Sequence, residues 1–110
     1  MNLDVWIDSY TEYKTICKQI GKDFCRLYKS SDEHKKVFIQ YCERHNANIY
    51  FRLFYMDGVS ADNIADMNNI DRRTVFKNID KESESFGIWL DNIFSLYAVT
   101  KQHYKSKLKM

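Results

Sequence analysis

Two consecutive arginines, Arg72 and Arg73, stand where a helix is expected to begin, directly after the capping residue Asp71. Cations in the first turn oppose the positive end of the helix dipole and cost about 0.3–1 kcal/mol each, so a purely structural helix would carry acids there. A helix that inserts its N-terminal end into the major groove of DNA gains from arginine at these positions, because a guanidinium can donate two hydrogen bonds to a guanine edge or to a phosphate. The pair therefore favours a helix that reads nucleic acid over a solvated pair on an ordinary helical hairpin.

The helix that begins with these arginines divides into a core face and an exposed face. Val75 and Ile79, followed one turn later by Ser83, recur at helical spacing and are expected to face the core. The candidate DNA-binding side chains point elsewhere; they are Arg72, Arg73, Thr74, Phe76, Lys77 and Lys81. Among them the arginines and the first lysine are expected to contact bases, and the threonine and the second lysine to contact phosphates.

A shorter helix and a turn must hold this reading helix in place. Ser60 is a good N-cap for that shorter helix, and Ala65 is small enough for a second helix to approach closely. Its apolar face is expected to consist of Ile64, Ala65 and Met67. Asn69 stands where the chain needs a left-handed residue, and Ile70 then returns to the core. The sequence therefore predicts a helix-turn-helix over residues 60–83.

Residues 58–81, GVSADNIADMNNIDRRTVFKNIDK, resemble the helix-turn-helix of sigma factor region four and, more closely, that of phage-type transcriptional regulators of the ArpU and RinA kind. The matching positions are Gly58, Ser60, Ile64, Ala65, Ile70, Arg73, Thr74, Val75, Ile79 and Lys81. The resemblance covers roughly residues 50–90, and Asn68 and Asn69 stand where leucine and glycine are usual. It implies a DNA-binding transcriptional regulator that acts on double-stranded DNA, with RNA polymerase as a further partner.

The composition predicts an all-α fold. The 110 residues contain no proline and only three glycines, and no Asn-Gly or Asp-Gly turn lies between alternating apolar runs. A chain of this length is expected to form a single domain over residues 1–110 that buries about two-thirds of its unfolded surface. We predict a helical bundle of five to six helices with long helices at both ends and no β-hairpin wing, which argues against the winged-helix repressors.

Three further helical stretches surround the motif. The first, over residues 4–29, has a heptad seam formed by Trp6, Tyr10, Tyr13, Cys17, Ile20, Phe24 and Leu27. Gly21 interrupts this stretch and indicates either a slight kink or a close helix crossing. Support helices are expected over residues 31–57, begun by a capping box of Ser30 and Glu33 and bent near residues 46–48. A last helix is expected over residues 86–107.

The charge distribution leaves an alternative open. The formal net charge is only +2, and residues 57–85 carry seven acidic side chains against four basic ones. This balance counts against DNA and favours a protein-interaction module that keeps the fold without binding a duplex. Two basic groups elsewhere could contact phosphates or simply keep the surface soluble; they are Lys101, Lys105, Lys107 and Lys109, and Lys35, Lys36, Arg44 and Arg52.

The sequence gives little support to enzymatic, metal-binding or membrane functions. It contains no glycine-rich phosphate loop and no nucleophile elbow, so we expect no catalytic residue and no cofactor. His34, Cys42 and His45 share helical spacing, but a fourth zinc ligand is missing and no metal is expected. The three cysteines suit reduced core thiols. With no signal peptide and no uncharged apolar run near the ~18 residues of a membrane span, we expect a cytoplasmic protein.

Large aromatic side chains at both ends of the chain indicate a homodimer. They are Trp6, Tyr10, Tyr13 and Phe24 near the N-terminus, and Trp89, Phe94, Tyr97 and Tyr104 near the C-terminus. So many large apolar groups exceed what one small core can cover, and large exposed apolar patches are unusual on monomers. The first and last helices are expected to form the dimer contact, and a symmetric pair would suit a symmetric operator. Alternatively, the two helices cover each other within one monomer.

Overall fold

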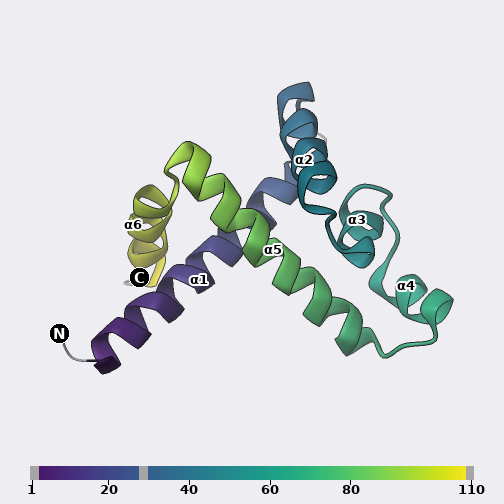
Figure 1. Ribbon diagram of the computed structural model, residues 1–110, viewed down its shortest axis with the longest axis horizontal. Helices are drawn as coiled ribbons and strands as arrows, with labels where there is room; N and C mark the ends of the chain where they lie inside the picture. The colour runs from purple at the N-terminus through teal and green to yellow at the C-terminus, as the bar shows by residue number, and fades with distance from the viewer. Residues whose placement is uncertain (1–2, 28–29, 109–110) are drawn as a thin grey trace.

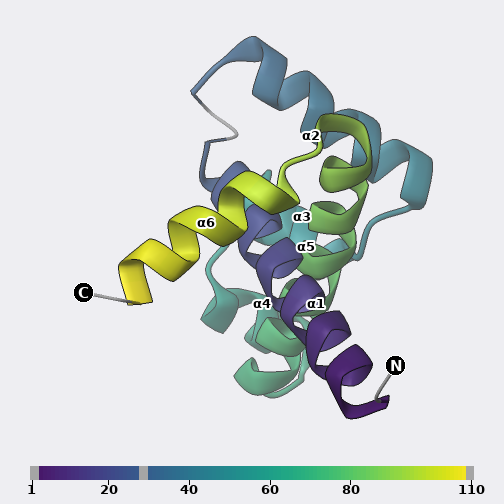
Figure 2. The same ribbon diagram turned by 90° about the vertical axis from the view of Figure 1, so that its left-hand side faces the viewer.

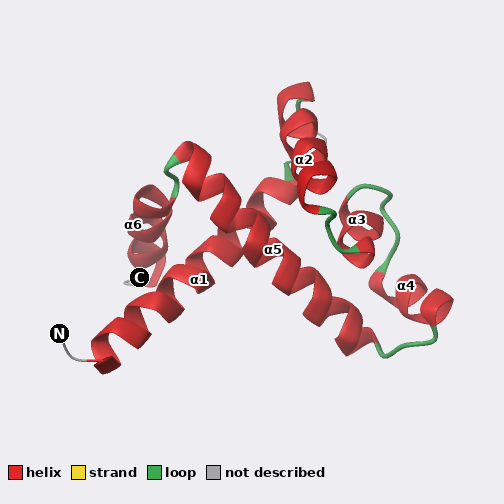
Figure 3. Ribbon diagram, in the orientation of Figure 1, coloured by secondary structure: helices red, strands yellow, loops and turns green. Residues whose placement is uncertain are grey.

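The computed structural model describes residues 3–27 and 30–108, with side chains described over residues 10–27 and 30–102. The described residues form six helices and no strand, which confirms the all-α expectation (Figures 1 and 3). The helices are α1 (Leu3–Arg26), α2 (Asp32–His45), α3 (Ile49–Tyr55), α4 (Ala61–Asn68), α5 (Arg72–Phe94) and α6 (Tyr97–Leu108).

The two longest helices, α1 and α5, cross where the C-terminal half of α1 meets the middle of α5 (Figure 1). A Cβ atom added to Gly21 of α1 would overlap the carbonyl oxygen of Ser83, and one added to Gly87 of α5 would overlap the carbonyl oxygen of Cys17. The backbones can approach this closely only because both positions lack a side chain. The sequence offered a kink or a close helix crossing as the reason for Gly21, and the structure shows the close crossing.

Phe86, on the buried side of α5, joins α2 and α3 to this crossing. Its ring centroid lies 5.4 Å from that of Phe24 on α1 and 4.6 Å from that of Tyr41 on α2. The rings of Phe38 on α2 and Phe51 on α3 follow at 5.7 and 6.2 Å. Edge-to-face and tilted arrangements of this kind add to the free energy gained from burying the rings. All three cysteines are free and buried, as expected of core thiols.

The helix after the turn does not end near residue 83, so the separate helix expected over residues 86–107 is wrong. One buried stripe runs the whole length of α5; it consists of Val75, Ile79, Ser83, Phe86, Gly87 and Leu90. The hydroxyl of Ser83 donates a hydrogen bond to the carbonyl of Ile79, so this polar residue is satisfied inside the helix. The break comes instead at Ser95, whose φ of 54° is left-handed.

The start of α2 also differs from expectation. The N-cap is Ser31, whose hydroxyl accepts a hydrogen bond from the backbone N–H of His34, so the capping box of Ser30 and Glu33 is wrong. Ser30 instead donates its hydroxyl proton to the carbonyl of Leu27 and closes the turn after α1. The bend near residues 46–48 is a full break, at which Asn46 is left-handed.

The heptad seam of α1 is buried only where α5 covers it. Cys17 and Ile20 are buried, whereas Leu27 is exposed. Further toward the N-terminus, α6 packs on α1: the rings of Tyr13 and Tyr97 lie 5.0 Å apart, centroid to centroid. The first and last helices thus cover each other in part within one chain (Figure 2). The side chains of Trp6 and Tyr104 lie outside the described residues.

Candidate nucleic-acid interface

Helices α4 and α5 and the turn between them form the predicted helix-turn-helix, at the opposite end of the molecule from α6 (Figure 1). The hydroxyl of Ser60 caps α4 by accepting a hydrogen bond from the N–H of Asn63. Asn69 is left-handed, with φ of 52°. Asp71 caps α5 through a hydrogen bond from the N–H of Arg73. These local features could be read from the sequence because each depends on only a few neighbouring residues.

The apolar face of α4 consists of Ala61, Ile64 and Ala65, all buried. The expectation for Met67 is wrong, because this side chain is 68% exposed. Positions 61, 64 and 65 follow the spacing of one helical face, whereas position 67 turns away from that face. The contact between α4 and α5 therefore depends on small and medium-sized side chains.

We expect Ala65→Leu to destabilise the protein by about 1–3 kcal/mol, because the larger side chain must fit into a position that is only 6% exposed. Thermal unfolding would measure the effect. Met67→Leu is the matched control, and its exposed position should leave the unfolding midpoint nearly unchanged. An unchanged midpoint for Ala65→Leu would mean that α4 and α5 do not depend on a small residue there.

The six candidate DNA-binding residues all lie on α5, but they do not share one face of the helix. Arg73, Lys77 and Lys81 recur every four residues on the exposed side opposite the buried stripe. The second stripe contains Arg72 and Phe76. The guanidinium of Arg72 lies 5.3 Å from the ring centroid of Phe76. Thr74, also exposed, lies on the flank between the cationic stripe and the core.

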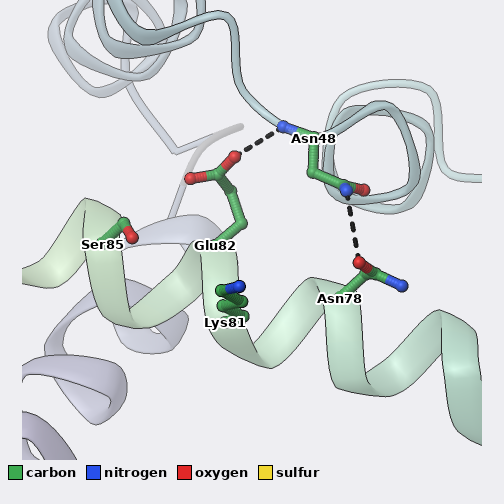
Figure 4. A pocket seen from close by; sticks show the side chains of 5 residues that line it. All are labelled: Asn48, Asn78, Lys81, Glu82 and Ser85. Carbon is green, nitrogen blue, oxygen red and sulfur yellow. Dashed lines mark hydrogen bonds between the residues drawn. The ribbon is translucent and has the colours of Figure 1, made fainter.

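Five of the six candidates line one or the other of two shallow hollows on α5. One is lined by Asp71, Arg72, Arg73, Phe76, Lys77 and Asp80, and so brings four of the six candidates together. Lys81 lines another, with Asn48, Asn78, Glu82 and Ser85 (Figure 4). Helix α5 thus offers a cationic end and, further along, a polar flank.

Glu82 in the second hollow has a structural role that the sequence analysis missed. Its carboxylate accepts hydrogen bonds from the Tyr41 hydroxyl, at 2.7 Å, and from the backbone N–H of Asn48 (Figure 4). Burial, and then the hydrogen bond to Glu82, raise the pKa of the Tyr41 hydroxyl well above its usual value, so it remains a donor. No local sequence signal could have revealed contacts between residues so far apart in the chain.

The excess of acidic residues around the motif is largely taken up by contacts within the protein. Asp80 pairs with Lys22 of α1 at 2.9 Å, and Glu84 pairs with Lys14 of α1 at 3.6 Å. Glu82 holds the α2–α3 corner, and Asp71 caps α5. These acids therefore help to fix α5 in place, and the negative balance counted along the sequence overstates the negative charge of the exposed stripe.

Asp62 of α4 contacts the second stripe, because its carboxylate lies 3.4 Å from Nε of Arg72. Both side chains are largely exposed, so the ion pair contributes little to stability. Together with the ring of Phe76, it gives the guanidinium one preferred position.

Apart from Arg52 on α3, the described members of the two basic groups outside the motif lie away from the start of α5. Helix α6, which carries Lys101, lies at the opposite end of the molecule, and α2 also lies away from α4 (Figures 1 and 2). Arg52 is half-buried, and its Nε is buried without a hydrogen-bond partner. Of the remaining lysines of the C-terminal group, Lys109 and the side chains of Lys105 and Lys107 lie outside the described residues.

The described part of the chain contains neither a metal-binding cluster nor a helix that could span a membrane. Among the described residues, no group of three or more His, Cys, Asp and Glu side chains is placed to hold a metal ion. His34 is hydrogen-bonded to Ser31, and His45 lies against the ring of Tyr41. In the same part of the chain, no helix has both the length and the apolar character needed to cross a membrane.

Comparison with known proteins identifies the family. The model of the UPF0122 family, described as helix-turn-helix proteins that are YlxM / p13 like, matches residues 41–109. No curated protein and no solved structure matches the chain. The family match extends over more than half of the sequence and includes the whole of α4, the turn and α5. This chain therefore belongs to the YlxM / p13-like family of helix-turn-helix proteins.

Proposed function

We propose that this protein is a transcriptional regulator that binds double-stranded DNA, with the N-terminal half of α5 in the major groove. The observation that carries the proposal is the exposed cationic stripe of Arg73, Lys77 and Lys81 on the second helix of a helix-turn-helix. In such motifs the first residues of the second helix contact base edges and later ones contact the sugar–phosphate backbone. The spacing of the stripe fits this division of roles.

The lack of ion-pair partners on the stripe supports the proposal. In the part of the chain that the structure describes, none of Arg73, Lys77 and Lys81 forms an ion pair, whereas Lys14 and Lys22 on α1 do. Unpaired cations aligned on one helix face repel one another, which is unfavourable without a polyanion nearby. A DNA duplex would relieve this repulsion and release its own counterions.

The type of regulator is proposed from the resemblance of residues 58–81 to sigma region four and to the ArpU and RinA kind of phage regulator. From the same resemblance we propose RNA polymerase as a further partner. Arg72, Arg73 and Lys77 would contact bases, with Phe76 beside them for a thymine methyl group, and Thr74 and Lys81 would contact phosphates. Membership of a helix-turn-helix family is consistent with this assignment.

Binding to duplex DNA at several salt concentrations tests the proposal. We expect the logarithm of the binding constant to fall linearly with the logarithm of the salt concentration, with a slope near −0.9 for each phosphate contacted. Selection of bound duplexes from a random pool should recover a defined sequence. The variant carrying Ala at positions 73, 77 and 81 should lose most of the salt dependence. If the parent shows no salt-dependent binding, the protein-interaction module is the better explanation.

A homodimer is part of the proposal, because two copies could read the two halves of a symmetric operator. Large apolar side chains remain exposed at the end opposite the motif: Ile93, Phe94 and Val99 are 52%, 49% and 70% exposed. A second copy joined at this end, with the two chains diverging from it, would present both reading helices to one duplex. The aromatic contacts between α1 and α6 within one chain leave this patch uncovered.

We expect light scattering at micromolar concentration to give about 26 kDa, twice the 13.2 kDa of one chain. Ile93→Asp should shift the mass toward 13.2 kDa, because a charge in the contact must be desolvated. Ile49→Asp, at an equally exposed position on α3, is the matched control and should leave the mass unchanged. A mass of one chain at all concentrations would rule out the dimer.

A further inference from the structure

A third hollow extends the surface of the reading helix onto α1. It lies between three helices and is lined by Lys22 and Arg26 of α1, Phe54 and Tyr55 of α3, and Phe76 and Asp80 of α5. The last two residues also line the hollow that contains Arg72, Arg73 and Lys77. The C-terminal turns of α1 and the start of α5 therefore form one continuous surface, with Phe76 and Asp80 in its middle.

The glycine crossing explains why α1 reaches this place. Because Gly21 touches the backbone of α5, the residues that follow it on α1 come close to Phe76 and Asp80 of α5, with which they line the hollow. Lys22, directly after Gly21, reaches Asp80 at 2.9 Å. Arg26, one turn later, has a side chain that is 70% exposed and makes only a 3.5 Å contact with Asp23. The end of α1 is thus fixed, while its last cation remains accessible.

The charges in the hollow favour a phosphate over a base or an apolar ligand. The ion pair with Lys22 offsets the negative charge of Asp80, which would otherwise oppose a polyanion at this point. The aromatic side chains already pack against one another, with ring centroids 4.9 Å apart for Phe54 and Tyr55 and 6.3 Å apart for Phe54 and Phe76. Burial raises the pKa of the Tyr55 hydroxyl to about 12, so it adds no negative charge at neutral pH. The accessible group that remains is the guanidinium of Arg26.

We propose that Arg26 of α1 contacts the DNA sugar–phosphate backbone on one side of the groove occupied by α5, with Lys22 neutralising Asp80 beneath it. This inference rests on the proposed binding of DNA through α5. Lys81 lies on the other flank of α5, beside Asn48 and Asn78 (Figure 4). The reading helix would then have one cation on each side, so both walls of the groove would be held. Phosphate contacts of this kind fix the position of a protein on DNA without reading sequence.

The test compares Arg26→Gln with the parent in salt-dependent binding to a duplex that the parent binds. We expect binding about three- to tenfold weaker at about 0.1 M salt, and a salt slope reduced by about 1. The loss should be the same on the selected and on a scrambled duplex. Arg26→Lys should restore most of the binding, because it keeps the charge. Lys101→Gln, which breaks another exposed ion pair at the opposite end of the molecule, is the matched control and should bind like the parent.

The outcomes separate this inference from the proposal on which it rests. If the parent binds DNA and Arg26→Gln binds with the same affinity and salt slope, then α1 takes no part and only this inference is overturned. If the loss is confined to one sequence, a base contact replaces the phosphate contact and the inference is also overturned. If the parent shows no salt-dependent binding, both are overturned. Equal thermal midpoints for parent and variant would exclude misfolding as the cause of a loss.

Discussion

Replacing Gly87 by alanine is expected to destabilise the protein by about 3 kcal/mol, although the same change in an ordinary helix would stabilise it by about 1 kcal/mol. The added methyl group would overlap the backbone carbonyl of Cys17. A side chain could rotate away, but a carbonyl in the middle of α1 can move only if the whole helix moves. Since α1 and α5 carry much of the core, such a shift would also loosen the contacts of Phe86.

Chemical denaturation, with the slope compared between variants, measures this effect directly. Gly21→Ala should behave similarly, because its methyl group would overlap the carbonyl of Ser83. Gly58→Ala is the matched control: no atom lies within 4 Å of the added methyl group, and its φ of +69° alone should cost about 1–2 kcal/mol. A Gly87→Ala variant as stable as the parent would mean that α1 and α5 do not cross as closely as described.

Replacing Arg73 by alanine is expected to weaken binding to the selected DNA site by about 5- to 150-fold, which corresponds to about 1–3 kcal/mol. Its guanidinium lies in the first turn of α5, on the exposed stripe, and its backbone N–H is already used by Asp71. Alanine keeps this backbone hydrogen bond, and the exposed guanidinium forms no ion pair among the described residues, so the fold does not depend on the side chain. Arg72→Ala should have an effect in the same range, because its guanidinium lies in the same first turn, between Asp62 and the ring of Phe76.

If these arginines read bases, the loss of binding affinity must depend on the DNA sequence. Selection from random duplexes should give a flatter base preference for each variant than for the parent, at the position that the missing arginine contacts. Arg44→Ala, an exposed arginine on α2 away from the motif, is the matched control and should leave both affinity and preference unchanged. If both first-turn variants bind the selected site like the parent, α5 does not read DNA with its N-terminal end.

Much of the motif could be predicted from the sequence because its determinants are local. Ser60 and Asp71 cap the two helices of the motif, and Asn69 adopts the left-handed conformation between them, as their residue types favour. The all-α fold followed from the lack of proline and of hairpin turns. Predictions that depended on the exact residue next to a helix end were less secure, because Ser30 and Ser31 are both suitable caps and the surrounding turn decided between them.

The length of α5 shows where local patterns were insufficient. Residues 83–85 look polar enough to end a helix, yet Ser83 is fully buried against α1. The crossing partner makes a small residue necessary at this position, and a serine that bonds back to Ile79 fills the space without breaking the helix. No local sequence pattern contains this information, because the residues that touch at the crossing, such as Gly21 and Ser83, are more than sixty residues apart in sequence.

By itself the sequence determined the helical class, the helix-turn-helix and the cationic residues of α5, since each follows from spacing, capping or charge within about twenty residues. Only the tertiary structure decided which acids are used internally and which cations stay accessible. Asp80 and Glu82 are engaged by Lys22, Tyr41 and Asn48, which reach them from helices and turns distant in the chain. A charge count along the sequence adds up residues that are neighbours in the chain. The charge of a binding surface depends instead on residues that are neighbours in space, and the glycine crossing of α1 and α5 decides which charged residues of the two helices come together.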